Sequence, residues 1–286
     1  MSDLWGKDSW LVEQLHPYYR KALRIEHKLV DEQTDFQHIE IYQTEFFGKV
    51  LVLDGIIQLT EMDNMGYHEM ITHVPCMAVA GARGAAGPRR VLIVGGGDGG
   101  SLQQVLRYPT IEEAVVCELD RRVVELSREH FTFFGDPWAD PRAKLVVQDA
   151  FQYLQEQQGS FDAIISDTTD PIGMAERLFS EEFYGLMWRA LTPGGAIATQ
   201  CEQMFFDSGL IKDIYAFTKK MAQNPAYYHA LIPTYPGGGI GFMYVSDTPW
   251  TEGLKAPYPP GQSNYLNPDI HRAAFALPEF FRRQMA

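Results

Sequence analysis

The chain has 286 residues, which is enough for one large or two smaller domains with a sizeable core. Hydrophobic residues make up 45% and charged residues 21%, as in an ordinary globular protein, and the formal net charge of −13 argues against nucleic acid and suits a cationic substrate. Three cysteines without paired spacing favour a reducing compartment, and the absence of a signal-peptide pattern or a long apolar run predicts a cytoplasmic protein that does not contact a membrane.

The N-terminal part of the chain predicts a small antiparallel sheet. Strand patterns occur at 24–30, 36–43, 48–53 and 56–60. The Asp54-Gly55 pair between the last two patterns is a strong hairpin signal. Residues 1–20 are rich in aromatic side chains but have no clear period. We therefore expect an N-terminal β domain at residues 1–62 and a helix at 63–80 after it.

From residue 91 onward, strands and helices alternate. Short apolar runs predict strands at 91–94, 114–120, 143–149, 161–167, 196–200, 228–232 and 241–245. Helical periodicity occurs between them, at 101–107, 122–129, 151–157, 181–191 and 210–221. This alternation predicts a doubly wound α/β sheet in a second domain at residues 63–286, with its ligands outside the carboxyl ends of the strands.

The segment 91–100 is the centre of this pattern. An apolar strand leads into a run of glycines, and a helix begins at Ser101. Glycines permit a positive φ and a close approach of the backbone to a ligand, so the segment resembles a nucleotide-binding turn. A glycine-rich turn alone is a weak signal. The Lys and Ser/Thr of a P-loop are missing, which excludes a nucleoside triphosphate site of that type.

Acidic residues follow several of the predicted strands, namely Asp98, Glu118, Asp149, Asp167 and Asp170. Each alone could be a helix cap or a solvated turn residue. A parallel sheet, however, places all its carboxyl ends at one edge, so we expect these carboxylates to cluster. Glu118 lies roughly twenty residues after the glycine run, where a carboxylate accepts hydrogen bonds from ribose hydroxyls.

The charge of this cluster points to a cationic nucleoside. Asp98, inside the glycine run, would repel a pyrophosphate, which disfavours a dinucleotide cofactor. A sulfonium nucleoside with a free amine would be attracted by Asp98 and Asp170, whereas one that also carries a carboxylate would be rejected. This logic favours decarboxylated S-adenosylmethionine over S-adenosylmethionine. No metal is expected, because no cluster has ligand spacing along the chain.

Five motifs, at 52–61, 67–70, 95–100, 167–173 and 232–238, resemble those of the polyamine aminopropyltransferases, or spermidine synthases, and they come in family order. The resemblance implies a β domain joined to a methyltransferase-like Rossmann domain. It implies transfer of the aminopropyl group of decarboxylated S-adenosylmethionine to a diamine, with putrescine as first choice, giving spermidine and 5′-methylthioadenosine. It further implies no permanently bound cofactor and a homodimer, for which the aromatic N-terminal region is a plausible contact surface.

The resemblance also implies roles for individual residues. Asp167 would be the general base, with Tyr67 orienting the amine and helping to deprotonate it. The nucleoside would be bound by Gln37, Gly95, Gly97, Asp98, Glu118, Asp149, Ala150 and Met174. The acceptor amine would be bound by His68, Asp98, Asp167, Asp170, Glu202 and Tyr235. Taken alone, His68 could equally be a satisfied buried histidine, Tyr235 a packing aromatic and Glu202 a surface acid.

Some positions depart from the family pattern. Asn64 stands where an acid is usual, Met174 replaces a proline that would flank the adenine, and Arg177 replaces a serine and adds a cation near the site. These changes leave open the nucleoside affinity and the acceptor, which could be putrescine, cadaverine, 1,3-diaminopropane or agmatine. The acceptor lining is expected to contain no cation unless Arg177 points into it. A methyltransferase on the same fold and a non-catalytic nucleoside-binding protein remain the alternatives.

Overall fold

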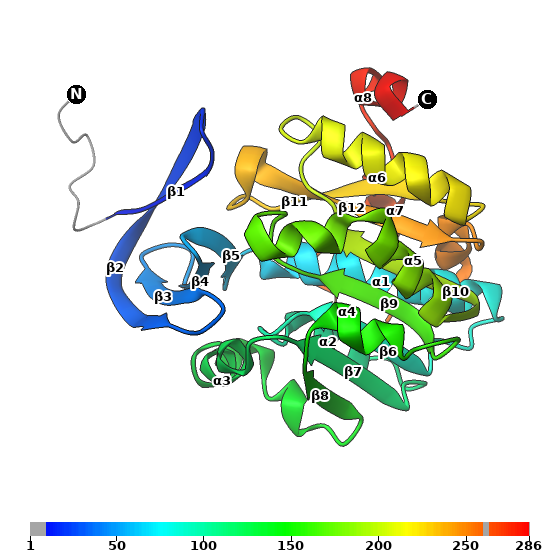
Figure 1. Cartoon of the computed structure of the whole chain (residues 1–286), viewed down its shortest axis with the longest axis horizontal. Coiled ribbons are helices and arrows are strands. Elements are labelled where there is room, and N and C mark those ends of the chain that lie inside the picture. Colours follow the sequence, from blue (N-terminus) through cyan, green and yellow to red (C-terminus); the bar gives the residue numbers. More distant parts are fainter. Residues whose placement is uncertain (1–9, 260–262, 286) are drawn as a thin grey trace.

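The computed structural model describes residues 10–259 and 263–285, which form two sheets side by side (Figure 1). The N-terminal sheet is antiparallel, and its five strands follow chain order. They are β1 (Trp10–His16), β2 (Tyr19–Gln33), β3 (His38–Thr44), β4 (Lys49–Leu53) and β5 (Ile56–Thr60). The predicted β sheet is confirmed, but β1 and the first part of β2 were missed. Most side chains of β2 are exposed or half-buried, so the sequence there has no apolar alternation.

The second sheet has seven strands in the order β11-β12-β10-β9-β6-β7-β8. Its strands are β6 (Arg90–Gly95), β7 (Glu113–Glu118), β8 (Ala143–Val147), β9 (Phe161–Asp167), β10 (Leu191–Gln200), β11 (Ala226–Leu231) and β12 (Gly239–Ser246). β10, β9, β6, β7 and β8 are mutually parallel, whereas β11 and β12 are antiparallel additions at one edge. The predicted α/β sheet is therefore present, and β10 begins at Leu191 rather than at Ala196.

Helices cover both faces of this sheet (Figure 1). They are α1 (Asn64–Ala82), α2 (Gly100–Leu106), α3 (Arg121–His130), α4 (Ala150–Gln155), α5 (Glu181–Ala190), α6 (Ser208–Met221), α7 (Pro268–Ala274) and α8 (Glu279–Met285). Short 3₁₀ segments lie at Thr132–Phe134, Pro137–Ala139, Gly173–Phe179, Pro236–Gly238 and Trp250–Lys255. The last two helices and the 3₁₀ segments had no clear sequence signal. No helix among the described residues is both long and apolar enough to cross a membrane.

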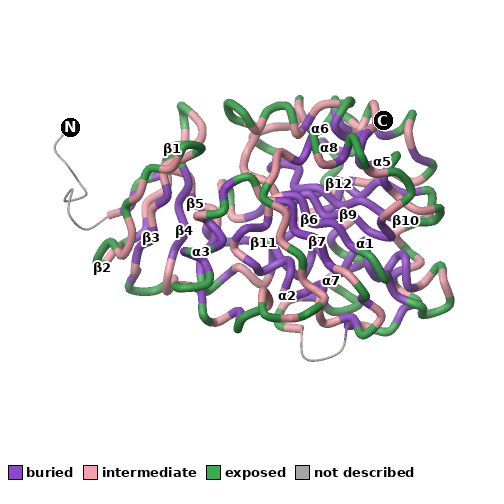
Figure 2. The backbone as a smooth tube through the Cα atoms, turned by 60° about the horizontal axis from the view of Figure 1, so that its bottom comes forward, coloured by how far each residue is buried: buried purple, intermediate pink, exposed green. Residues whose placement is uncertain are grey.

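Two cores flank the seven-stranded sheet, because successive side chains of a strand point to opposite faces. In β6, Val91 and Ile93 pack in the core that contains α1, whereas Leu92 and Val94 pack in the core that contains α5. Helix α1 is buried from Gly66 to Ala80, including the polar side chains His68, Glu69, Thr72 and His73. Figure 2 shows these buried stretches concentrated in the central strands and α1.

The two sheets meet through a third cluster. Ile39, Ile41 and Leu51 of the N-terminal sheet pack with Val123 and Leu126 of α3. This contact holds the β2–β3 turn and the β4–β5 hairpin next to the carboxyl ends of β6 and β7. The expected domain boundary at residue 62 falls in the connection between β5 and α1, and it stays a prediction.

Candidate active site

A cavity of about 350 Å³ lies between the N-terminal sheet and the carboxyl edge of the seven-stranded sheet. Its wall contains most of the residues that the sequence analysis proposed, from strands that are distant along the chain. These are Gln37, Tyr67, Gly95, Gly97, Asp98, Glu118, Asp149, Ala150, Asp167, Asp170, Met174, Glu202 and Tyr235. His68 is the exception: it is buried at 2% exposure and does not line this cavity. The acidic strand ends therefore cluster as expected.

The glycine run passes directly beside Asp167. Gly95 and Gly96 have φ values of +71° and +67°, and the Gly96 N–H donates to the Asp167 carbonyl at 2.8 Å. A Cβ on Gly95 would lie 2.2 Å from that carbonyl oxygen. Glycine is thus required here both for the backbone conformation and for the approach of the two strand ends.

Gly95→Ala should destabilise the protein by about 2–4 kcal/mol, because the methyl group meets backbone that cannot move aside. Gly194→Ala is the matched control, since Gly194 has nearly the same φ (+74°) and nothing within 4 Å of its added Cβ. It should cost about 1–2 kcal/mol. Urea unfolding of both variants measures the difference, and equal losses would mean that the close approach to Asp167 is unimportant.

Asp167, the last residue of β9, is a half-buried acid in the cavity wall. Ser101 Oγ donates to its Oδ2 at 2.7 Å, and the Tyr67 hydroxyl also hydrogen-bonds to it. Burial and the nearby Asp98 carboxylate raise the pKa of Asp167 to about 6, against the opposing effect of His68. Burial and Asp167 raise the pKa of Tyr67 well above its usual value, so its hydroxyl stays a donor. The assignment of Asp167 as the base, with Tyr67 orienting the amine and helping to deprotonate it, stays a prediction.

His68 is a hydrogen-bond partner of the Asp98 carboxylate. Its Nε2 is 3.3 Å from Asp98 Oδ2, while Asp98 Oδ1 accepts the Gly100 N–H at 2.6 Å. Burial alone would lower the pKa of His68, but the Asp98 carboxylate outweighs it and raises that pKa. Reciprocally, His68 outweighs the effect of burial and lowers the pKa of Asp98. His68 is thus buried with a partner for Nε2 only, since its Nδ1 has no hydrogen-bond partner among the described residues, and its proposed contact with the acceptor amine stays a prediction.

One ligand atom each from His68, Asp98 and Asp167 lies within 4.8 Å of the others. Spacing along the chain could not reveal this cluster, because the three residues follow different elements. Such a group can bind a cation, either a metal ion or an ammonium.

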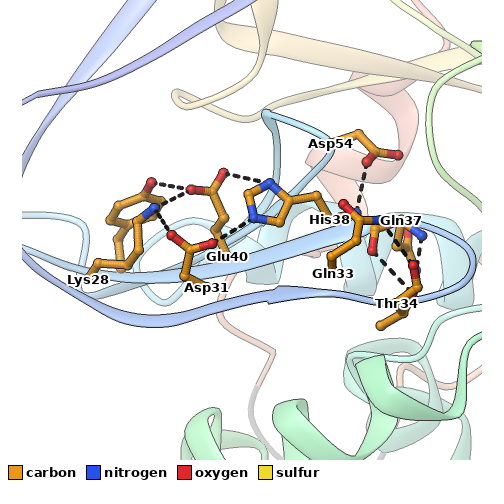
Figure 3. Close-up of polar contacts among 9 residues, drawn as sticks. Lys28, Asp31, Gln33, Thr34, Gln37, His38, Glu40 and Asp54 are labelled. Atoms are coloured by element: carbon orange, nitrogen blue, oxygen red, sulfur yellow. Dashed lines mark hydrogen bonds and ion pairs between the residues drawn. The ribbon is translucent and has the colours of Figure 1, made fainter.

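At the nucleoside end, the proposed residues are held by short contacts. Gln37 follows the turn shown in Figure 3, where its N–H donates to Thr34 Oγ1 at 3.1 Å. The side chains of Gln37 and Thr34 both donate hydrogen bonds to Asp120 Oδ2, at 3.1 Å and 2.7 Å respectively. Glu118 Oε1 accepts the Asp120 N–H at 2.9 Å, and burial raises the pKa of Glu118 to about 7. Asp120, which also follows β7, was not among the predicted site residues.

Asp149 has two partners. It caps α4 by accepting the Phe151 N–H at 2.8 Å, as an ordinary helix-capping acid would. Its other oxygen lies 3.4 Å from Arg177, whose guanidinium is stacked 4.0 Å from the centre of the Phe151 ring. Arg177 therefore pairs with an acid at the nucleoside end and not at the acceptor end. Met174 is 65% exposed at the same rim.

At the opposite end, Glu202 is a buried acid and not a surface acid. It is 5% exposed, and Gln200 Nε2 donates to its Oε1 at 2.8 Å. Burial and the neighbouring Asp170 raise the pKa of Glu202 well above its usual value. Burial likewise raises the pKa of Asp170. The Tyr235 hydroxyl donates to the Gln58 carbonyl at 2.6 Å, so this ring is held against β5.

The expectation that the acceptor lining contains no cation is wrong. Lys21 of β2 lies in the cavity wall with Glu13 of β1, and its Nζ is 2.9 Å from Glu13 Oε1. His16 of β1 also lines the cavity, 3.6 Å from Asp207. No local pattern marks these residues, because only the fold brings β1 and β2 to the carboxyl edge of the other sheet.

The carboxyl-edge cavity, the glycine turn and Asp167 in the cavity wall define the class of protein: an α/β enzyme whose site lies against an N-terminal β sheet. Two family models match the chain between residues 9 and 253. The spermine/spermidine synthase domain covers residues 64–253, and the spermidine synthase tetramerisation domain covers residues 9–61.

Similar proteins agree over nearly the full length. A spermidine synthase of Dictyostelium discoideum is 37% identical, covering 98% of both chains. A polyamine aminopropyltransferase of Leptospira biflexa is 38% identical, covering 95% of this chain and 96% of the relative. A spermine synthase of Arabidopsis thaliana is 36% identical, covering 98% of this chain and 80% of the relative. The relatives are thus named for different products.

Solved structures agree with the fold. A spermidine synthase in complex with the transition-state analogue AdoDATO superposes with a TM-score of 0.91 at 32% identity, covering 98% of this chain and 96% of that one. The chain therefore belongs to the spermine/spermidine synthase family and is an aminopropyltransferase. This sets aside both alternatives, the methyltransferase and the non-catalytic nucleoside-binding protein.

Proposed function

We propose that the enzyme transfers the aminopropyl group of decarboxylated S-adenosylmethionine to putrescine, giving spermidine and 5′-methylthioadenosine. The observation that carries this proposal is the half-buried Asp167 carboxylate, hydrogen-bonded by Tyr67, which lines one cavity together with Asp98, Asp170 and Glu202. A similar enzyme solved with a transition-state analogue supports the assignment.

The reaction requires a placed amine and a base. The amine nitrogen attacks the propyl carbon next to the sulfonium, the carbon–sulfur bond breaks, and its electron pair stays on the sulfur of 5′-methylthioadenosine. A primary alkylamine has a pKa of about 10, by analogy with lysine, so it arrives protonated and must lose a proton before it can attack. Asp167, whose pKa is raised to about 6, is ionised at neutral pH and takes that proton.

The donor would lie along the glycine turn. Glu118 would accept hydrogen bonds from the ribose hydroxyls, and Asp149 would accept one from the adenine amino group. Asp98 would attract the propyl ammonium, which suits the cation-binding cluster that it forms with His68 and Asp167. A carboxylate in the same place would be repelled, so S-adenosylmethionine should bind poorly.

The acceptor would place one amine at Asp167 and its other ammonium at Asp170 and Glu202. Butylamine has the stem of putrescine but lacks the second ammonium, so it would leave these buried groups without their partner. We expect kcat/KM for butylamine to be lower than for putrescine by at least about tenfold, a free-energy difference of about 1.4 kcal/mol or more. Steady-state rates with both amines test this two-ended binding, and equal rates would refute it.

The proposal also covers the oligomeric state of the enzyme and its cellular compartment. The name of the N-terminal family model supports an oligomer of identical subunits, of which the homodimer expected from the sequence is one form. The three cysteines are free and buried, which is consistent with a reducing compartment such as the cytoplasm.

A further inference from the structure

The end of the cavity next to Asp170 contains a cation that belongs to the protein itself. Lys21 Nζ lies 2.9 Å from Glu13 Oε1 and also donates to the Thr234 carbonyl. The lysine side chain is 11% exposed and the glutamate side chain 1%, so this ion pair is largely withdrawn from water. Both residues line the same cavity as the proposed catalytic acid.

The pair lies on the acceptor side. Asp170 is among the groups whose charge acts on Lys21 and on Glu13, whereas the charges that act on Asp167 are those of Asp98 and His68. The Lys21 ammonium is also 5.7 Å from the centre of the Tyr235 ring, another wall of the proposed acceptor site. An amine that reached past Asp170 would therefore encounter an ammonium and not a free carboxylate.

Both carboxylate oxygens of Glu13 already have a partner. Its Oε1 is paired with Lys21, and its Oε2 accepts the Ile57 N–H at 2.7 Å. A third nitrogen on a longer amine would need a carboxylate at this depth, because a buried ammonium without a partner is costly. The Glu13 carboxylate could be that partner, but it is already paired with Lys21.

We propose that Lys21 is a resident cation that restricts the acceptor to diamines, by occupying the carboxylate that the end ammonium of a triamine would require. This inference rests on the proposed function and deepens it, since it concerns the length of the acceptor at the same site. The transfer step itself is unchanged: the attacking amine still loses its proton to Asp167, and 5′-methylthioadenosine still leaves.

The test measures kcat/KM for putrescine and for spermidine, a triamine, as acceptors. The wild-type enzyme should use putrescine and strongly disfavour spermidine. Lys21→Ala removes the ammonium and exposes Glu13, so the ratio of spermidine to putrescine rates should rise by at least about tenfold. In the double variant Lys21→Ala/Glu13→Gln the freed carboxylate is absent, and the ratio should fall back toward the wild-type value.

Lys28→Ala is the matched control. Lys28 lies on the same strand and is likewise paired, 2.6 Å from both Asp31 and Glu40, but it does not line the cavity (Figure 3). Its removal should leave the ratio unchanged. Melting curves monitor folding, and Lys21→Gln, which removes the charge while keeping a donor for the Thr234 carbonyl, replaces the alanine variant if that variant is unstable.

The possible outcomes distinguish a failure of the proposed function from a failure of the resident-cation proposal. Wild-type turnover of putrescine tests the proposed function, and its absence would refute that function whatever the variants do. Putrescine turnover with an unchanged ratio in both Lys21 variants would refute the resident-cation proposal alone. So would a gain that persists in the double variant, or a wild-type enzyme that uses spermidine as well as putrescine.

Discussion

Replacing Asp167 with Asn should lower kcat by about 10²–10⁴-fold while leaving nucleoside binding nearly intact, because the variant keeps the shape of the site but cannot accept the proton of the amine. The raised pKa of about 6 adds a pH dependence. Since the base must be ionised, wild-type kcat/KM should fall as the pH drops below about 6, and this acidic limb should be absent from the residual activity of the variant.

Stopped assays of product formation between pH 5 and 8, together with titration of the nucleoside, measure both effects. Glu176→Gln is a suitable control, because Glu176 is an exposed acid in the same loop region that does not line the cavity. It should keep wild-type turnover. Turnover near the wild-type rate in Asp167→Asn would show that another group removes the proton.

The second large effect concerns the choice between two donors. Asp98→Asn should weaken the binding of decarboxylated S-adenosylmethionine by about tenfold to a hundredfold, as expected for the loss of a charged hydrogen bond. The same change should improve the binding of S-adenosylmethionine, because it removes the repulsion of the carboxylate. The difference between the two affinities should therefore shrink, because one affinity decreases while the other increases.

Calorimetric titration of both nucleosides against the wild type and the variant measures this gap. Glu112→Gln makes the same change in net charge at an exposed ion pair with Arg89 outside the cavity, and it should leave both affinities unaltered. If the affinity ratio is the same in Asp98→Asn as in the wild type, Asp98 does not discriminate between the donors.

Much of the fold and of the nucleoside end could be predicted because local pattern and topology agree there. The βα alternation places the ends of β6, β7 and β9 at one edge, so Asp98, Glu118 and Asp167 had to approach each other once the sheet was parallel. The close passage of Gly95 next to Asp167 follows from the same arrangement.

The acceptor end was less accessible to sequence reasoning. Burial alternates in β1, but a glutamate (Glu13) is buried and Val12 is exposed, so the sequence lacks the apolar alternation that marks a strand. The start of β2 buries few side chains, and Glu13 meets Lys21 only because the two strands pair antiparallel. The contact between the sheets through Ile39 and Val123 joins segments far apart in the chain, which no local pattern reports. The role of His68 as a partner of Asp98 likewise depends on a tertiary contact.

The most direct test of aminopropyl transfer to putrescine is the mass of the product formed from each donor. The enzyme should convert putrescine to spermidine with decarboxylated S-adenosylmethionine, release 5′-methylthioadenosine in equal amount, and form no methylated amine with S-adenosylmethionine. A methylated product, or loss of the nucleoside without an aminopropylated amine, would contradict the account.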